Sequence, residues 1–377
     1  MARSNQPGLK SAGVTIKAVA QYVGLTPGTV SAVLNDSPAA QVIPEQTKNR
    51  VHAAAKELNY RPNFFARTLR SKRTYTIGVI AEEIGDSYGS LVISGIEQYL
   101  TEMGYAFITV VHRHDQQLLS QYSQLLLGRG VEGVITIDTT VYESLPLPMV
   151  AVAGHKKVKG VTNIVLDHFR AATLVLNHLA DLGHERIAFM RGNPISSDSR
   201  VRWKALCEVA HNIGLKIDRE LTVEIDLDDP TPRLGYPFAR QLLSRNKPFT
   251  ALVAYNDISA IGAIRALQEQ GLRIPQDVSV IGFDDIPSAA FNSPTLSTVR
   301  QPLARMGQIA AQILLQRISG KDNDPSEIAV EPELVVREST GRAATKFADQ
   351  LGRAGVGTGI RALHTRPKPA TESSSKP

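Results

Sequence analysis

Residues 14–35 read VTIKAVAQYVGLTPGTVSAVLN, and this stretch decides the fold of the amino-terminal region. Thr15 has the hydroxyl of a helix N-cap, and apolar residues follow it with a 3.6-residue period until Gly24. Thr26 is a second N-cap, with Pro27 at the first helical position, where its missing N–H costs nothing. Two short helices joined by a tight, glycine-containing turn are typical of a helix-turn-helix.

A third helix is predicted just downstream. It opens at Pro44–Glu45 and presents an apolar face made of Val51, Ala54, Ala55 and Leu58. Short helices with inward apolar faces pack into a small domain. We therefore expect an all-α head.

Basic residues concentrate at the two ends of the chain. Residues 1–75 carry a net charge of +8, residues 76–341 carry −7 and residues 342–377 carry +5. A basic head on an acidic body is expected of a nucleic-acid-binding module attached to another domain. Basic ends that merely aid solubility would give the same pattern, so charge alone leaves both readings open.

Composition excludes several classes of protein. The 377 residues, 42% hydrophobic and 21% charged, suit two or three globular domains. No apolar run reaches the 18 residues of a spanning helix, and the first 30 residues lack the apolar core of a signal peptide. Cys207 is the only cysteine, which excludes an internal disulfide framework and a cysteine-built metal cluster. We expect a soluble, cytoplasmic protein.

From Thr76 onward, short β-rich runs alternate with amphipathic helical stretches. Continuous apolar strands suit a parallel sheet that is buried on both faces. Two successive sets of such units predict two doubly wound subdomains, with a ligand in the cleft at the carboxyl ends of the strands. The expected strands are Tyr75–Ala81, Ala106–Val111, Gly133–Ile137, Met149–Ala153, Ile187–Met190, Thr222–Ile225, Ala251–Ala254 and Val278–Phe283.

The chain resembles the lactose/galactose-repressor (LacI/GalR) family of bacterial transcription regulators over about residues 14–341. In the head the resemblance rests on residues 14–20, 24–31, 33–35 and 57–63. In the body it rests on Ile77–Ile80, Gly183–Phe189, Asn256–Asp257, Val278–Asp285, Leu296–Pro302 and Leu334–Thr340. The order and number of these matches carry the resemblance, more than any single motif.

The resemblance implies an all-α helix-turn-helix head and an α/β, periplasmic-binding-protein-like body of two doubly wound parallel-sheet subdomains. The expected domains are a DNA-binding head (1–60), a hinge helix or linker (61–75), an effector-binding and dimerisation domain (76–341) and a disordered basic tail (342–377). Within the body, the N-lobe is expected at about 76–167 plus 297–318, and the C-lobe at about 168–296 plus 319–341.

In this family the second helix lies in the major groove, which places Pro27, Gly28 and Ala32 at base-reading positions. These three residues offer no side-chain donor, so the expected direct base code is weak. The position of Ala32 usually carries a long polar side chain, and this chain departs from that pattern. The remaining candidates in the head are Thr15, Lys17, Thr26, Thr29, Ser31 and Asn35. The alternative is that Thr26 is only a cap and that Ser31 only faces a neighbouring turn.

The matching hinge segment of the family folds into a short helix on DNA, and leucines from two subunits wedge into the minor groove. Leu69 is the matching residue here, and the alternative is an ordinary apolar linker residue. The surrounding basic run would dominate nonspecific affinity through counterion release. The DNA-binding candidates of this segment are Arg61, Asn63, Arg67, Leu69 and Arg70.

The resemblance also implies a small effector, frequently a sugar, in the cleft of the body. A guanidinium fork and a carboxylate, from Arg202 and Asp284, can grip vicinal hydroxyls or an anionic group. Asn256 should add an amide contact, Asp167 a strand-end carboxylate, and Tyr88 a ring that stacks on the effector.

Two departures from the family's pattern put the effector's identity in doubt. The usual Asn-Pro-Phe-Phe reads Asp86-Ser87-Tyr88-Gly89, and His168 stands where Asn is common. Asp257 and Asp285 are interpreted as caps of the helices that follow them.

The remaining motifs are interpreted as structural. Gly128-Arg129-Gly130-Val131-Glu132-Gly133 spells G-x-G-x-x-G, but a helix precedes it and a strand follows, so it predicts a helix C-cap and turn. His112, His114 and Asp115 suggest a solvated turn more than a metal site. Cys207 is expected to be a buried spectator, and His184 to start a strand without a chemical role.

Taken together, these patterns predict a homodimeric transcriptional regulator, a repressor, which binds a near-palindromic operator under the control of an effector. No catalytic constellation and no cofactor are predicted, so the protein should not be an enzyme. The alternatives are an activator or low-specificity DNA binder with the same fold and, less favoured, a solute-binding protein.

Overall fold

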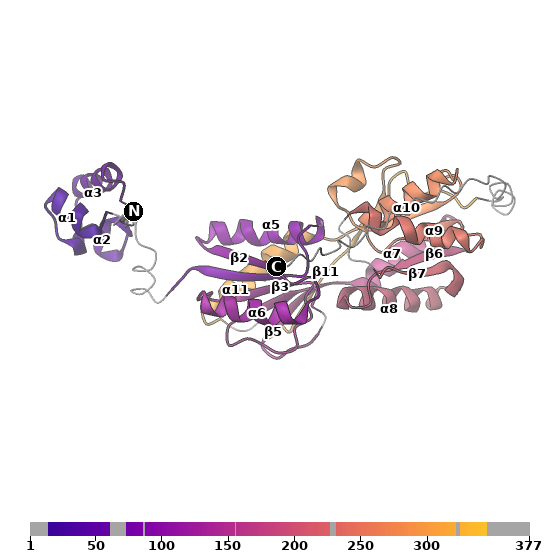
Figure 1. The fold of residues 1–377 in the computed structure, drawn as a ribbon, viewed down its shortest axis with the longest axis horizontal. Helices are drawn as coiled ribbons and strands as arrows, with labels where there is room; N and C mark the ends of the chain where they lie inside the picture. The colour runs from indigo at the N-terminus through magenta and orange to yellow at the C-terminus, as the bar shows by residue number, and fades with distance from the viewer. Residues whose placement is uncertain are drawn as a thin grey trace, which may run out of the picture. The chain divides into compact units, whose positions relative to one another are not determined.

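The computed structural model describes residues 14–60, 73–85, 87–154, 156–226, 231–321 and 325–344. The chain forms two compact units, a head (Met1–Thr74) and a body (Tyr75–Pro377), each of which is described by itself (Figure 1). In the described part of the chain, no helix combines the length and the apolar character needed to cross a membrane.

The head is a three-helix domain with one additional short 3₁₀ turn. Its elements are α1 (Ile16–Val23), α2 (Pro27–Leu34), η1 (Pro38–Ala40) and α3 (Glu45–Glu57). Thr15 and Thr26 cap α1 and α2 as predicted, and Gly24 ends α1 with a left-handed φ of +67°. Val19, Val30 and Val51 meet in a fully buried core. The predicted helix-turn-helix is confirmed.

The body contains two six-stranded sheets. The first sheet has the order β11-β5-β4-β3-β1-β2 and the second the order β12-β10-β9-β8-β6-β7. All pairings are parallel except that of β10 with β12. The strands are β1 (Thr76–Ala81), β2 (Ala106–Val111), β3 (Val134–Ile137), β4 (Met149–Val152), β5 (Val161–Leu166), β6 (Ile187–Arg191), β7 (Thr222–Glu224), β8 (Ala251–Val253), β9 (Ser279–Asp284), β10 (Ser297–Arg300), β11 (Glu327–Val330) and β12 (Glu333–Val335).

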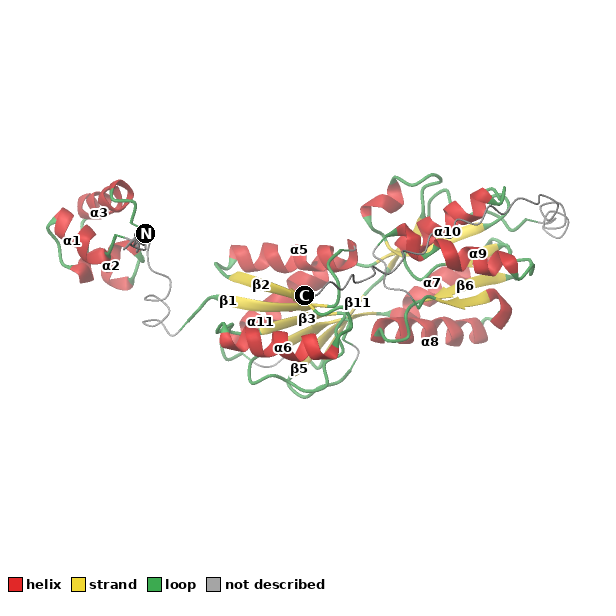
Figure 2. Cartoon of the chain, in the orientation of Figure 1, coloured by secondary structure: helices red, strands yellow, loops and turns green. Residues whose placement is uncertain are grey.

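Helices cover both sheets. The first lobe holds α5 (Ser87–Glu102), α6 (Gln116–Gly128) and α11 (Leu303–Ile318), and the second lobe holds α7 (His168–Asp181), α8 (Ser197–Asn212), α9 (Tyr236–Ser244) and α10 (Asp257–Glu269). The 3₁₀ turns η2 (Arg219–Leu221), η3 (Pro232–Leu234) and η4 (Pro287–Ala290) complete the second lobe. Figure 2 shows α5 and α6 on opposite faces of the first sheet, so its strands are buried on both sides, as their continuous apolar sequences predict.

The two lobes are connected by three crossings of the chain, and these correct the expected lobe boundaries. The crossings follow β5, follow β10 and lie between β11 and β12. Segment 297–318 was expected as one block in the first lobe, but β10 pairs with β9 in the second sheet. Conversely, β11 pairs with β5 in the first sheet, although 319–341 was expected in the second lobe. A late segment completes whichever sheet edge is open, and its position in the sequence does not reveal which one.

The topology indicates where a ligand can bind. In the first sheet, β2 and β3 flank β1 on opposite sides, and in the second sheet β7 and β8 flank β6 in the same way. The direction of winding therefore reverses next to β1 and next to β6. Doubly wound sheets bind ligands beyond the carboxyl ends of the strands at such a reversal.

Candidate functional site

The first lobe brings three titratable side chains together at the carboxyl ends of its strands. Glu82 follows β1, His114 follows β2 and Asp138 follows β3. Oε1 of Glu82 lies 2.6 Å from Nε2 of His114, and the Glu82 and Asp138 side chains share a hydrogen bond. These contacts join the ends of adjacent strands.

The pKa values of the two carboxyl groups are shifted in opposite directions. Burial raises the pKa of Asp138 well above its ordinary value, and the charge of Glu82 reinforces this effect. Burial also opposes ionisation of Glu82, but the hydrogen bonds from His114 and Asp138 outweigh it and lower the pKa of Glu82. These opposite shifts favour the proton on Asp138, which in that form can donate it in a hydrogen bond to the Glu82 carboxylate.

The second lobe contributes a buried arginine, Arg202, on α8. Its Nη2 donates to Oδ2 of Asp198 over 2.5 Å, and its Nη1 donates to the carbonyl oxygen of Tyr255 over 2.6 Å. The guanidinium carbon lies 3.7 Å from the centre of the Phe283 ring and 4.8 Å from that of Tyr255. The guanidinium is therefore held between two aromatic faces and is already paired with a carboxylate.

His168 extends this array toward a crossing between the lobes. It is the first residue of α7, directly after the chain leaves the first sheet. Its Nε2 lies 2.8 Å from Oδ1 of Asp198, and its ring stacks on Phe283 with centroids 6.2 Å apart. Sequence reasoning noted His168 only as a departure from the family's Asn and did not single out Asp198. The four-residue spacing of Asp198 and Arg202 on one helix was the signal that could have found the pair.

Asp284 ends β9 in a strained conformation. Its φ of +111° lies in a region that L-residues rarely adopt, and such strain clusters at functional sites. Nε2 of Gln301 donates to Oδ1 of Asp284 over 2.6 Å, and the Asp284 side chain is buried.

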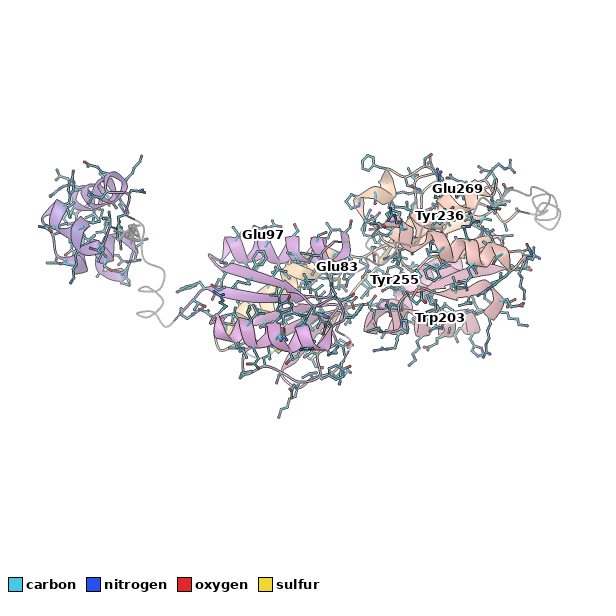
Figure 3. The ribbon with its side chains drawn as sticks, in the orientation of Figure 1. Glu83, Glu97, Trp203, Tyr236, Tyr255 and Glu269 are labelled. Carbon is cyan, nitrogen blue, oxygen red and sulfur yellow. The ribbon has the colours of Figure 1, made fainter. Side chains whose placement is uncertain are left out.

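A direct contact joins the two lobes at this cluster. The Ser196 hydroxyl, at the N-cap of α8, donates to Oδ1 of Asp138 over 3.3 Å. Tyr88, on α5, lies close enough to Asp198, Asp138 and Asp284 for their charges to raise its pKa further, although burial is the largest cause of that shift. The Tyr88 hydroxyl is buried and has no hydrogen-bond partner among the described residues. In Figure 3, Tyr255 and Glu83, the neighbour of Glu82, lie at the junction of the lobes. We call Glu82, Tyr88, Asp138, His168, Asp198, Arg202, Tyr255 and Asp284 the interlobe cluster.

Three of the five predicted effector residues lie in the interlobe cluster, and two hold helix ends. Tyr88, Arg202 and Asp284 belong to the cluster. Asp167 caps α7 by accepting from the amide of Arg170 over 2.8 Å. Asn256 caps α10 by accepting from the amide of Ser259 over 2.9 Å. An effector contact by any of the five stays a prediction.

The cap interpretation of Asp257 and Asp285 is wrong. Asn256, not Asp257, caps α10, and the buried Asp257 accepts from the amide of Ile286 and the hydroxyl of Thr298. Asp285 forms ion pairs with Arg300 and Arg337 over 2.7 Å and 2.6 Å. Both carboxylates find partners far along the chain, which local sequence cannot indicate.

The histidine pair does not form a solvated turn, so that expectation is also wrong. His112 is 3% exposed, and its Nε2 lies 3.0 Å from the Thr139 hydroxyl. His114 turns inward to Glu82. Across the described residues, no group of three or more His, Cys, Asp or Glu side chains is arranged to hold a metal ion.

The other motifs set aside by sequence have structural roles. Gly128 ends α6 and Gly130 has a φ of +72°, which confirms the turn. Cys207 is only partly buried on α8, so the expectation of a buried cysteine is wrong. His184 lies between Thr250 and the Gly341 carbonyl, just ahead of β6.

On the head, the candidate DNA-contacting side chains are exposed or partly exposed. Lys17, Pro27 and Gly28 are exposed, whereas Ala32 is half-buried. The Thr26 hydroxyl accepts from the Thr29 amide over 3.1 Å, and Thr15 caps α1 in the same way. Nδ2 of Asn35 donates to the Ser31 carbonyl over 2.8 Å. The polar groups of α2 therefore already have local hydrogen bonds, which does not strengthen a direct base code.

Five predicted DNA-binding residues lie outside the described residues. They are Arg61, Asn63, Arg67, Leu69 and Arg70.

Comparisons with known proteins agree with this architecture. Residues 15–63 match the family of bacterial regulatory proteins, lacI family, and residues 176–340 match the periplasmic binding protein-like domain. The HTH-type transcriptional repressor PurR of Haemophilus influenzae (strain ATCC 51907) is 33% identical over 337 residues, covering 86% of this chain and 98% of the relative. PurR of Aliivibrio fischeri (strain MJ11) is 31% identical over 333 residues, with the same two coverages.

Solved structures are similar over the same length. The lac repressor dimer bound to operator and the anti-inducer ONPF aligns with a TM-score of 0.77 at 26% identity, covering 87% of this chain and 99% of that one. The transcriptional regulator CelR in complex with cellobiose aligns with a TM-score of 0.64 at 28% identity, covering 86% and 99%.

Proposed function

The chain belongs to the lacI family of bacterial regulatory proteins, and from this premise we propose that it binds a near-palindromic operator as a homodimer, in answer to a small effector held by the interlobe cluster. It is a DNA-binding transcriptional repressor with an effector domain, and its family consists of regulators and not of enzymes. A regulator works where the chromosome lies, so we place it in the cytoplasm.

The observation that carries the effector proposal is the interlobe cluster itself. Acidic, guanidinium, phenol and imidazole groups from both lobes converge at the carboxyl ends of the strands, where doubly wound sheets bind ligands. A molecule held there contacts both lobes and so favours one relative position of them over another.

We propose a polyhydroxylated effector such as a sugar. Arg202 already has its carboxylate partner in Asp198, so it is poorly placed to neutralise an anionic ligand. The carboxyl groups of Asp138 and Asp284 can accept from hydroxyls, and the Tyr88 hydroxyl and Nε of Arg202 have no partner among the described residues and can donate. The similarity to a regulator in complex with cellobiose supports the same class.

The homodimer proposal is supported by an exposed aromatic side chain of the second lobe and by the cavity next to it. The Phe291 side chain is 87% exposed, which is unusual for an aromatic residue of a monomer. Next to Phe291 in sequence, Asn292 and Ser293 help to line a cavity of about 490 Å³. Its other lining residues include Pro232, Tyr236, Ile261 and Ile264 and the polar Arg233, Arg265 and Gln268. A second copy of the chain that covers this face would hold two heads in the symmetry of a palindrome.

Selection of genomic DNA fragments by the purified full chain tests the proposal at near-physiological salt. A recurrent near-palindrome supports a dimeric, sequence-specific reader, and the genes beside it narrow the effector to a few candidates. Salt-sensitive binding without any enriched sequence would instead favour the low-specificity alternative, which the lack of side-chain donors at Pro27, Gly28 and Ala32 motivates.

A further inference from the structure

Tyr75, the first residue of the body, makes contacts with Glu132, Ala106 and Tyr105. Its amide donates to Oε1 of Glu132 over 2.9 Å, and its carbonyl accepts from the amide of Ala106 over 2.9 Å. Its ring packs edge-to-face against Tyr105, with centroids 5.4 Å apart. The Tyr105 hydroxyl in turn donates to Oε2 of Glu132 over 3.4 Å.

The backbone at Tyr75 is strained. Its φ of +48° is in the left-handed region, which is unfavourable for an aromatic L-residue. Such a conformation persists only when the surroundings impose it. The Glu132 carboxylate, the Ala106 amide and the Tyr105 ring are among the groups that hold this conformation, and the Tyr75 side chain is 40% exposed.

In the sequence, Tyr75 lies between the proposed DNA-binding segment and the central strand β1. Residues 61–73 precede it and contain a dense run of basic residues, and β1 begins directly after it. β1 lies between β2 and β3 in the first sheet, so the backbone at Tyr75 is attached to a strand that has neighbours on both sides.

The same two strands that meet at Tyr75 and Glu132 also meet in the interlobe cluster. Tyr75 and Glu82 flank β1 (Thr76–Ala81), and Glu132 and Asp138 lie before and after β3 (Val134–Ile137). Side-chain hydrogen bonds join the two strands at both ends, between Tyr75 and Glu132 and between Glu82 and Asp138. A six-residue strand is about 20 Å long, so a shift of β1 along β3 at the interlobe cluster would also displace the Tyr75 backbone at the other end of β1.

We propose that Glu132 is a positioning residue for operator binding: by holding the Tyr75 amide, it sets the direction in which the DNA-binding segment leaves the body. This inference rests on the proposed function. A fixed exit raises the effective concentration of the segment at its DNA site, because fewer orientations are lost on binding.

The test compares three variants of the full chain. Glu132→Ala removes both acceptors, whereas Glu132→Gln keeps an acceptor for the Tyr75 amide and can donate to the Tyr105 hydroxyl. Glu102→Ala, at an exposed glutamate near the end of α5, is the matched control. Affinity is measured for the fragment enriched in the genomic selection and for a shuffled duplex of equal length, and the melting temperature of each variant is recorded.

We expect Glu132→Ala to lower affinity for the enriched fragment about tenfold, with little change for the shuffled duplex or in melting temperature. Glu132→Gln and Glu102→Ala should bind as the parent does. Parental affinity of Glu132→Ala overturns the proposal, and so does an equal loss on both duplexes or a loss in Glu132→Gln as large as in Glu132→Ala.

A second measurement does not depend on the operator. Trypsin cleavage after Arg73 should be faster in Glu132→Ala than in the parent, and unchanged in Glu132→Gln. Equal cleavage rates in all variants would contradict the proposed role of Glu132 in holding Tyr75, even if no operator is found. A parent protein that binds DNA without sequence preference, together with faster cleavage of Glu132→Ala, would support that role of Glu132 and refute the proposed function.

Discussion

The Ser196 hydroxyl of one lobe donates to Oδ1 of Asp138 in the other over 3.3 Å, and this contact joins the lobes beside the proposed effector site. Burial and the charge of Glu82 raise the pKa of Asp138 and so favour its protonated form, in which Asp138 can accept from Ser196 and donate to Glu82. The contact between lobes is therefore linked to a protonation state.

Deprotonation of Asp138 should weaken the folded body. Since its pKa is raised in the folded state, its contribution to stability is complete below the unfolded pKa and is lost as the pH rises through the folded value. Asp138→Asn remains neutral, with an amide to donate to Glu82 and a carbonyl for Ser196. We expect its melting curve to depend less on pH than that of the parent. Trp203, the single tryptophan, provides the fluorescence signal. If the melting temperature of Asp138→Asn depended on pH as that of the parent does, Asp138 would not be the source of this pH dependence.

Asp257 should add a second, separable pH dependence. Burial raises its pKa to about 7, against hydrogen bonds from Thr298 and Ile286 that lower it. The protein should therefore lose stability as the pH rises from about 4 to about 7, by up to about 4 kcal/mol for this group. Asp257→Asn should remove that slope, because its amide can donate to Thr298 while its carbonyl accepts from Ile286. Urea unfolding at pH 5 and pH 8 measures the change in the free energy of unfolding for the parent and for Asp257→Asn. An equal change in both proteins would refute the role of Asp257 in this pH dependence.

Removal of Arg202 should destabilise the second lobe as well as the effector response. Arg202→Ala leaves the buried Asp198 carboxylate with His168 as its main partner, and breaking a buried ion pair costs about 3–5 kcal/mol. Asp198→Asn combined with Arg202→Ala removes the uncompensated charge and should recover part of that loss. Equilibrium unfolding of the single and double variants gives the coupling energy. A double variant no more stable than Arg202→Ala would show that the pair does not act as a unit.

Phe291→Asp should convert the dimer to a monomer, because a charge on the proposed dimer face must be desolvated when two copies meet. Operator affinity should fall with it, since two heads bind as one unit. Ile195→Asp, at another exposed apolar residue of the second lobe, is the control. Sedimentation velocity reports the oligomeric state, and a dimeric Phe291→Asp protein would place the interface elsewhere.

Leu69→Ala tests the wedge that the family resemblance implies. If Leu69 inserts into the minor groove, its loss should reduce affinity for the selected operator by tenfold or more and leave the melting temperature unchanged. Gel-shift titration with the operator and with a shuffled duplex separates this from a general loss of DNA binding. Equal operator affinity in the parent and the variant would contradict insertion of Leu69 into the minor groove.

The sequence by itself determined the elements whose causes are local. Thr15, Gly24, Thr26 and Pro27 act on amides and torsions within a few residues, so the head helices begin and end where those residues predict. Apolar runs likewise predicted β1 to β4 and β6 to β9, whereas β5, β10, β11 and β12 were not recognised. In β5, Thr162 and Asn163 interrupt the apolar pattern.

Only the tertiary structure decided which distant residues meet. Three crossings between the lobes place β10 and β11 in sheets that sequence order did not predict, and they bring Asp138 to Ser196. Asp257 and Asp285 read as helix caps in sequence, yet their partners lie on other segments of the fold. The physical reason is range: caps and periodicity act over about four residues, whereas buried charges are satisfied by whatever the packed fold brings within hydrogen-bonding distance.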